Sequence, residues 1–141
     1  METLILTGWG WSDYACAAAL ALRRFDQAEV RGVSTRRLPE LLNEISGYKT
    51  ILILGVGLTG NPELLQRRVK KLCTKGVKLR WISALPFPES LPQSLSAPLE
   101  PFIDEDSVTA AVSNCFQIPC ADLLPLVQEE NATPELRRYR Q

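Results

Sequence analysis

The sequence predicts an α/β fold, namely a three-layer, doubly wound, mainly parallel sheet of four to five strands with helices on both faces. Short apolar segments alternate with amphipathic segments along the chain, which is the pattern of βαβ units. One of these segments, Thr50–Leu54, is apolar on both sides, as a central parallel strand is when helices cover both faces. The 141 residues, 45% of them apolar, fit one compact domain.

Three strands and two helices are predicted in the first half of the chain. Ser12 or Asp13 should cap the first helix, whose small alanines can pack closely on a sheet. Hydrophobic periodicity and turn residues set the bounds of all five elements. The strands are Thr3–Thr7, Glu29–Val33 and Thr50–Leu54, and the helices are Tyr14–Phe25 and Leu38–Ile45.

The second half continues the alternation of strand and helix patterns and then becomes rich in proline. Asn61, Pro62 and Glu63 supply an N-cap, a first-turn proline and an acidic first turn for a helix that ends at about Thr74. Five of the ten prolines lie between positions 86 and 101, which excludes a regular helix there. The remaining elements are strands Val77–Ile82 and Leu99–Ile103 and helices Ser107–Phe116 and Ala121–Gln128. We predict one domain over residues 1–128, with 129–141 as a tail or the start of a further segment.

Composition narrows the classes of partner. With 16 basic and 16 acidic residues, the chain lacks the global basic field of a nucleic-acid-binding protein, so nucleic acid is not an expected partner. Basic pairs such as Arg67-Arg68 and Lys70-Lys71 are interpreted as solvated helix faces. No apolar run is long enough for a membrane span, and the N-terminus lacks the pattern of a secretory signal. The cytoplasm is therefore the expected compartment.

The four cysteines do not form a recognisable metal or redox motif. Cys16, Cys73, Cys115 and Cys120 contain no C-x-x-C pair, which argues against a zinc ribbon or a thioredoxin-like site. In a reducing compartment Cys115 and Cys120 should not form a disulfide. We expect all four to be buried free thiols.

A candidate pocket follows from the ends of three predicted strands. In an open parallel sheet, ligands bind beyond the carboxyl ends of the strands. The glycines after the first strand are typical of an anion nest at a helix N-terminus, so a nucleotide or an anion is the candidate ligand. The predicted pocket residues are Gly8, Trp9, Gly10, Trp11, Ser12, Asp13, Gly55 and Ser83.

Over Leu4 to about Leu91, these segments resemble the N-terminal domain of the DHH phosphoesterase superfamily. Members carry T-H-x-D-x-D-G after the first strand, D-x-G after the third and D-H-H-P after the fourth. Here the corresponding positions are Gly8, Gly10 and Ser12, then Gly55, then Ser83-Ala84-Leu85-Pro86, and the chain contains no histidine. The resemblance implies Mn²⁺ or Mg²⁺ as the family's cofactor, but the ligand residues are absent from this chain. We therefore predict no metal ligand, no catalytic residue and no cofactor.

The acidic residues that remain are interpreted as structural. Two divalent ions need several hard ligands, and Asp13 alone cannot hold them. We expect Asp13 to cap the first helix and Asp122 to begin the last one. The run Asp104-Glu105-Asp106 is expected to be a solvated loop and N-cap before Ser107.

Two further readings of the strand ends concern Trp9, Trp11 and the serines. The tryptophans could stack on a base, or they could fill the hollow that the lost ligands leave, and filling is the expectation. Serine catalysis is not expected, because neither Ser12 nor Ser83 has a histidine to act as its base.

Three functional hypotheses remain open on sequence grounds. The first is a non-catalytic binding or assembly module, with a protein partner or a homo-oligomer as the candidate assembly. The second is an active metal-dependent phosphoesterase that uses unconventional ligands such as Asp13 and Asp104. The third is the N-terminal piece of a longer family member, whose second domain would close over the site.

Overall fold

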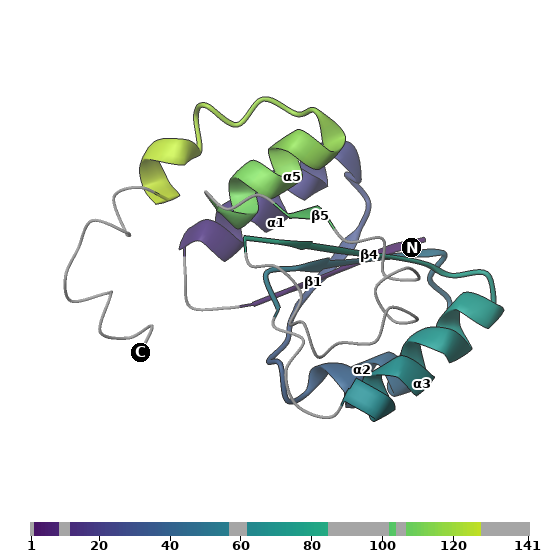
Figure 1. The fold of residues 1–141 in the computed structure, drawn as a ribbon. Coiled ribbons are helices and arrows are strands. Elements are labelled where there is room, and N and C mark those ends of the chain that lie inside the picture. The colour runs from purple at the N-terminus through teal and green to yellow at the C-terminus, as the bar shows by residue number, and fades with distance from the viewer. Residues whose placement is uncertain (1, 9–11, 57–61, 85–101, 104–106, 128–141) are drawn as a thin grey trace.

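The computed structural model describes residues 2–8, 12–56, 62–84, 102–103 and 107–127 (Figure 1). The strands are β1 (Thr3–Thr7), β2 (Glu29–Gly32), β3 (Thr50–Leu54), β4 (Lys78–Ser83) and β5 (Phe102–Ile103). The helices are α1 (Ser12–Arg24), α2 (Leu38–Glu44), α3 (Pro62–Thr74) and α5 (Val108–Phe116). The predicted bounds of β1, β3 and α3 are confirmed, and those of α1, β2, α2, β4 and α5 differ by one or two residues.

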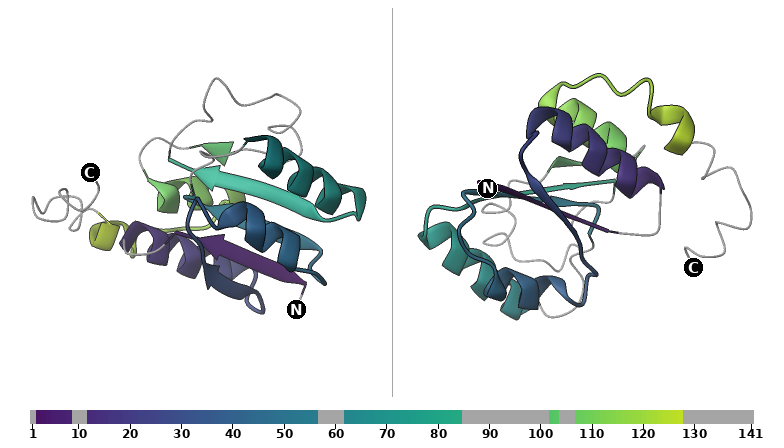
Figure 2. Two further views of the ribbon diagram at one scale, coloured as in Figure 1. Left: turned by 90° about the horizontal axis from the view of Figure 1, so that it is seen from below. Right: turned by 180° about the vertical axis from the view of Figure 1, so that it is seen from behind.

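The predicted fold class is confirmed. The five strands are parallel and lie in the order β2-β1-β3-β4-β5. Helices α1 and α5 cover one face of the sheet, and α2 and α3 cover the other (Figures 1 and 2). The chain is therefore doubly wound, and all carboxyl ends of the strands meet at one edge.

Strand alternation divides the core into two apolar clusters. Leu4 and Leu6 of β1 pack against α2 and α3, whereas Ile5 between them packs against α1 and α5. Residues 51–54 of β3 alternate in the same way and are at most 1% exposed. Their burial on both faces confirms that β3 is a mid-sheet strand.

The last predicted helix is shorter than expected. Residues 121–123 form turns, and helix is assigned only from 124 to 127. The backbone amides of Leu123 and Leu124 both bond to the Cys120 carbonyl, at 2.9 and 3.1 Å, so the segment starts as a tight turn. Other predictions lie outside the described residues: the N-cap Asn61, positions 99–101 of the fifth strand, Gln128, the tail 129–141, the proline-rich segment and the acidic run 104–106.

Ser107, predicted as the first residue of the helix that precedes this turn, is instead its N-cap, and the helix begins at Val108. The Ser107 hydroxyl accepts a hydrogen bond from the Ala110 amide at 2.9 Å, the bond of an N-cap serine. The four cysteines are free, as predicted. Only Cys16 is fully buried, so the expectation of burial is wrong for Cys73, Cys115 and Cys120, which are half-buried. None of the described helices is both long and apolar enough to cross a membrane.

Candidate functional site

The carboxyl ends of β1 and β3 meet the first turns of α1 and α5. Backbone pairing continues past the strands, because the Gly8 amide bonds to the Leu54 carbonyl at 3.3 Å and the Gly55 amide to the Ile82 carbonyl at 2.9 Å. Of the predicted pocket residues, Gly8, Ser12, Asp13, Gly55 and Ser83 are described. Trp9, Gly10 and Trp11 lie outside the described residues, so their filling role stays a prediction.

The ring of Tyr14 occupies the space above Gly8 and Gly55. A Cβ atom on Gly8 would lie 2.9 Å from Tyr14 Cε2, and one on Gly55 would lie 2.6 Å from Tyr14 Cε1 and 3.1 Å from Val108 Cγ2. Gly55 also has a φ of +71°, which side chains other than glycine rarely adopt. The two strand ends therefore carry glycine where a side chain would collide with an aromatic ring. We call the contact of Tyr14 with Gly8, Gly55 and Val108 the Tyr14 plug.

Asp13 is buried, and its carboxylate binds the N-terminus of α5. Oδ2 accepts from the Val108 amide at 3.0 Å, and Oδ1 accepts from the Thr109 amide at 2.9 Å. The Thr109 hydroxyl lies 2.8 Å from Asp13 Oδ1 and 3.0 Å from the Asp13 carbonyl oxygen, and both are acceptors for its proton. The first amides of a helix lack partners within the helix and carry partial positive charge, so a carboxylate suits them.

This arrangement corrects the prediction that Asp13 caps its own helix. Helix α1 starts at Ser12, so Asp13 lies within its first turn and its side chain bonds a helix that starts 95 residues later. Only tertiary structure reveals this partner. Tyr14 was missed altogether, although two strand-end glycines beside an aromatic residue in the following helix are a weak signal of close packing.

Ser83 ends β4 beside Gly55, because Leu54 pairs with Ile82 and the Gly55 amide bonds to the Ile82 carbonyl. It is 5% exposed and pairs in register with Ile103 at the end of β4. Alternation along β4 puts its side chain on the same face as Trp81, which belongs to the cluster under α2 and α3. Asp13 instead contacts α5 on the opposite face. The structure thus brings Gly8, Gly55 and Ser83 to neighbouring strand ends, with the side chain of Ser83 and the carboxylate of Asp13 on opposite faces of the sheet.

The described residues at this edge do not fit a pair of divalent ions. Glycine offers no side-chain ligand, and both oxygens of the Asp13 carboxylate already accept hydrogen bonds from Val108 or Thr109. Coordination of a metal by Asp13 would leave those buried donors without partners. Within the described ranges, no group of three or more His, Cys, Asp or Glu side chains could hold a metal ion.

Two polar clusters lie elsewhere. Arg23 of α1 donates to Asp122 at 2.6 Å and to the Pro119 carbonyl at 3.2 Å, and its hydrogen bond to the carboxylate lowers the pKa of Asp122. Asp122 therefore pairs with α1 instead of beginning the last helix, which corrects that prediction. At the sheet edge, hydrogen bonds from Tyr48 and from Arg31 lower the pKa of Glu29.

Two hollows lined by described residues lie at the opposite, amino ends of the strands. One has a volume of about 170 Å³ and lies beside Tyr48, Ile51 and Val77. The other, about 460 Å³, is more polar and lies beside Thr3 and Arg24. Neither is lined by Asp13, Gly8 or Gly55.

Comparison with known proteins leaves the family open. No protein-family model matches the chain, and no curated protein does either. Among solved structures it is similar to the crystal structure of RecJ in complex with Mn²⁺ from Thermus thermophilus, with a TM-score of 0.46 and 14% sequence identity. The similarity covers 85% of this chain and 19% of that one, so the chain spans about a fifth of that protein. A likeness of this size assigns neither family nor activity to the chain.

Proposed function

We propose that this chain is a non-catalytic binding or assembly module with a DHH-like α/β fold, in which the catalytic edge has become structural. The observation that carries the proposal is the use of Asp13, the one carboxylate among the candidate pocket residues, to hold the N-terminus of α5. The Tyr14 plug supports it, because an aromatic ring lies above the strand ends that would otherwise face a ligand.

The chemistry of phosphoester hydrolysis explains why this matters. Two-metal hydrolysis needs a cluster of anionic or imidazole ligands that binds the ions and lowers the pKa of a bound water. The chain has no histidine, and the described strand ends offer glycine and serine at the corresponding positions. Recruiting Asp13 as a ligand would break its bonds to α5 and leave the buried Val108 and Thr109 amides without an acceptor.

The test combines Mn²⁺ binding with turnover in the same samples. Calorimetric titration with Mn²⁺ is expected to give no stoichiometric binding, and a short oligoribonucleotide and polyphosphate should remain uncleaved. Asp13→Asn tests whether Asp13 contributes to any Mn²⁺ binding. Asp26→Asn, at an exposed position, is the matched control. Binding of about two ions per chain with turnover, both lost in Asp13→Asn and kept in Asp26→Asn, would establish the active phosphoesterase instead.

A further inference from the structure

Among the described residues, no strand pairs with the outer edge of β2. β2 is the terminal strand, and β1 is its neighbour in the described sheet (Figure 2). The Val33 amide bonds to the Thr7 carbonyl at 2.9 Å, which fixes the side toward which alternate backbone groups point. Since these groups alternate along a strand, those of Arg31 face β1 and those of Val30 and Gly32 face outward.

The two charged side chains of this edge strand have opposite signs, so they can attract a second strand in a suitable register. Natural edge strands are often guarded by lysine or proline, and Glu29–Gly32 contains neither. Val30 is 40% exposed and is one of two large apolar side chains exposed among the described residues. An accessible apolar residue whose own amide and carbonyl face outward is suited to contact with another strand.

We propose that β2 pairs antiparallel with β2 of a second copy of this chain, about a twofold axis at Val30. A second copy of the chain is then the partner in the assembly role, and this proposal rests on the proposed function. In this register Val30 faces Val30, and Glu29 of each copy faces Arg31 of the other. The interface is isologous and closes on itself, so it produces a dimer instead of a filament.

Charge complementarity fixes the register. The Val30 pair exchanges both backbone bonds, so the flanking Glu29 and Arg31 positions form non-hydrogen-bonded pairs, in which opposite side chains approach most closely. An axis at position 29 would place glutamate against glutamate, and one at position 31 would place arginine against arginine. Both alternatives bring like charges together, so the axis at Val30 is favoured.

The charged side chains are already held in place. Arg31 Nε donates to Glu29 Oε1 at 3.1 Å, and the Tyr48 hydroxyl donates to Glu29 Oε2. Both partners lower the pKa of Glu29 and keep its carboxylate ionised to lower pH. Because four residues form the strand, the interface is smaller than that of a typical stable complex. We therefore expect a dimer of micromolar affinity that weakens with salt.

Sedimentation equilibrium of the full chain tests the proposal, over about 1–500 µM protein and at low and high salt. Wild type should shift from monomer to dimer as concentration rises. Arg31→Glu and Glu29→Arg should each weaken the dimer about tenfold or more, because both cross-strand pairs become repulsive. The double exchange Glu29→Arg with Arg31→Glu should restore it. Arg37→Glu makes the same charge change at the N-cap of α2 and should leave the affinity unchanged.

Val30→Pro gives a second, independent arm. Proline removes the outward amide of Val30 and leaves the bonds of Arg31 and Val33 to β1 in place. Circular dichroism should show that this variant is folded, and sedimentation equilibrium should show a monomer at every concentration. A monomeric wild type, a double exchange that fails to restore pairing, or a folded proline variant that still dimerises would overturn the proposal.

The Mn²⁺ experiment separates this inference from the proposed function. A monomer without Mn²⁺ binding would overturn the dimer and leave a non-catalytic module. A dimer that hydrolyses oligoribonucleotide would leave the β2 interface and overturn the proposed function.

Discussion

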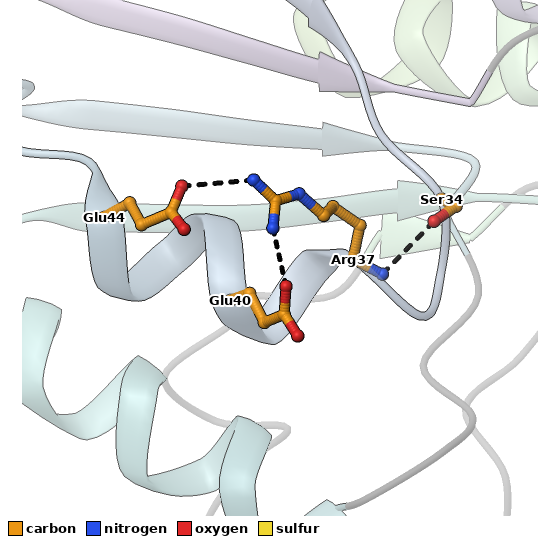
Figure 3. Close-up of polar contacts among 4 residues, drawn as sticks. All are labelled: Ser34, Arg37, Glu40 and Glu44. Carbon is orange, nitrogen blue, oxygen red and sulfur yellow. Dashed lines mark hydrogen bonds and ion pairs between the residues drawn. The ribbon is translucent and has the colours of Figure 1, made fainter.

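The two helical layers cover the same sheet in different ways. In the α1–α5 layer, polar contacts join elements that are distant in sequence. Asp13 accepts a buried hydrogen bond from Thr109, and Arg23 forms an exposed ion pair with Asp122. In the α2–α3 layer, the contact with the sheet is apolar, with Leu42 and Leu72 in one large cluster. The ion pairs of α2 stay within that helix and its approach, where Arg37 contacts Glu40 and Glu44 (Figure 3).

This difference places the polar contacts of the candidate site in one layer. Tyr14 and Asp13 both belong to the α1–α5 layer, and both act at the carboxyl ends of β1 and β3. The same first turn of α1 therefore covers Gly8 and Gly55 and holds α5. The α2–α3 layer supplies apolar cover, so substitutions on its outer surface should have little effect on the candidate site.

The largest effect is expected from Asp13→Ala. It leaves the Val108 and Thr109 amides without their acceptor in a buried place, at a cost of about 3 kcal/mol in the free energy of unfolding. Asp13→Asn keeps one carbonyl oxygen as an acceptor and should cost about half as much. Urea unfolding measures both. Equal stability of Asp13→Ala and wild type would show that this carboxylate does not hold α5.

The next effect is expected from Gly55→Ala, at about 2 kcal/mol of lost stability. The new Cβ meets Tyr14 Cε1 at 2.6 Å, and the backbone is held at a φ of +71°. In a double-mutant cycle with Tyr14→Ala, the steric part should be relieved and the backbone part should remain. Strictly additive losses would contradict the Tyr14 plug. Gly47→Ala, also at positive φ and with nothing within 4 Å of its Cβ, is the matched control for the backbone part.

A smaller effect concerns the titration of Asp122. Because Arg23 lowers the folded-state pKa of Asp122, their pair stabilises the fold above the unfolded pKa, and this stabilisation is lost as pH falls through the folded pKa. Arg23→Gln should raise the Asp122 pKa toward its ordinary value of 3.8, measured by NMR of the side-chain carboxyl carbon. An unchanged titration would mean that the two side chains do not pair in solution.

The smallest effect is expected in the α2–α3 layer. Arg37→Ala removes ion pairs whose side chains are more than half exposed, and it should change the unfolding free energy by about 0.5 kcal/mol or less. Added salt should reduce the difference further. A loss of unfolding free energy as large as that of Asp13→Ala would contradict the difference between the two layers.

The sequence predicted the fold well and the site only in part. Local apolar patterns were enough for β1 and β3, since burial on both faces leaves little choice of residues. The glycines at positions 8 and 55 were recognised as strand ends, but the ring that requires them was not. Asp13 was recognised as a helix-capping residue, yet its helix lies 95 residues further along the chain, beyond the reach of any local rule.

The central claim is that Asp13 holds α5 and is not a metal ligand. The most direct test follows the amide NMR signals of Val108 and Thr109 while Mn²⁺ is added to the wild-type protein. Our account predicts that these signals broaden no more than amides at the amino ends of the strands. Selective broadening at Val108 and Thr109 that saturates at one or two ions per chain would contradict it.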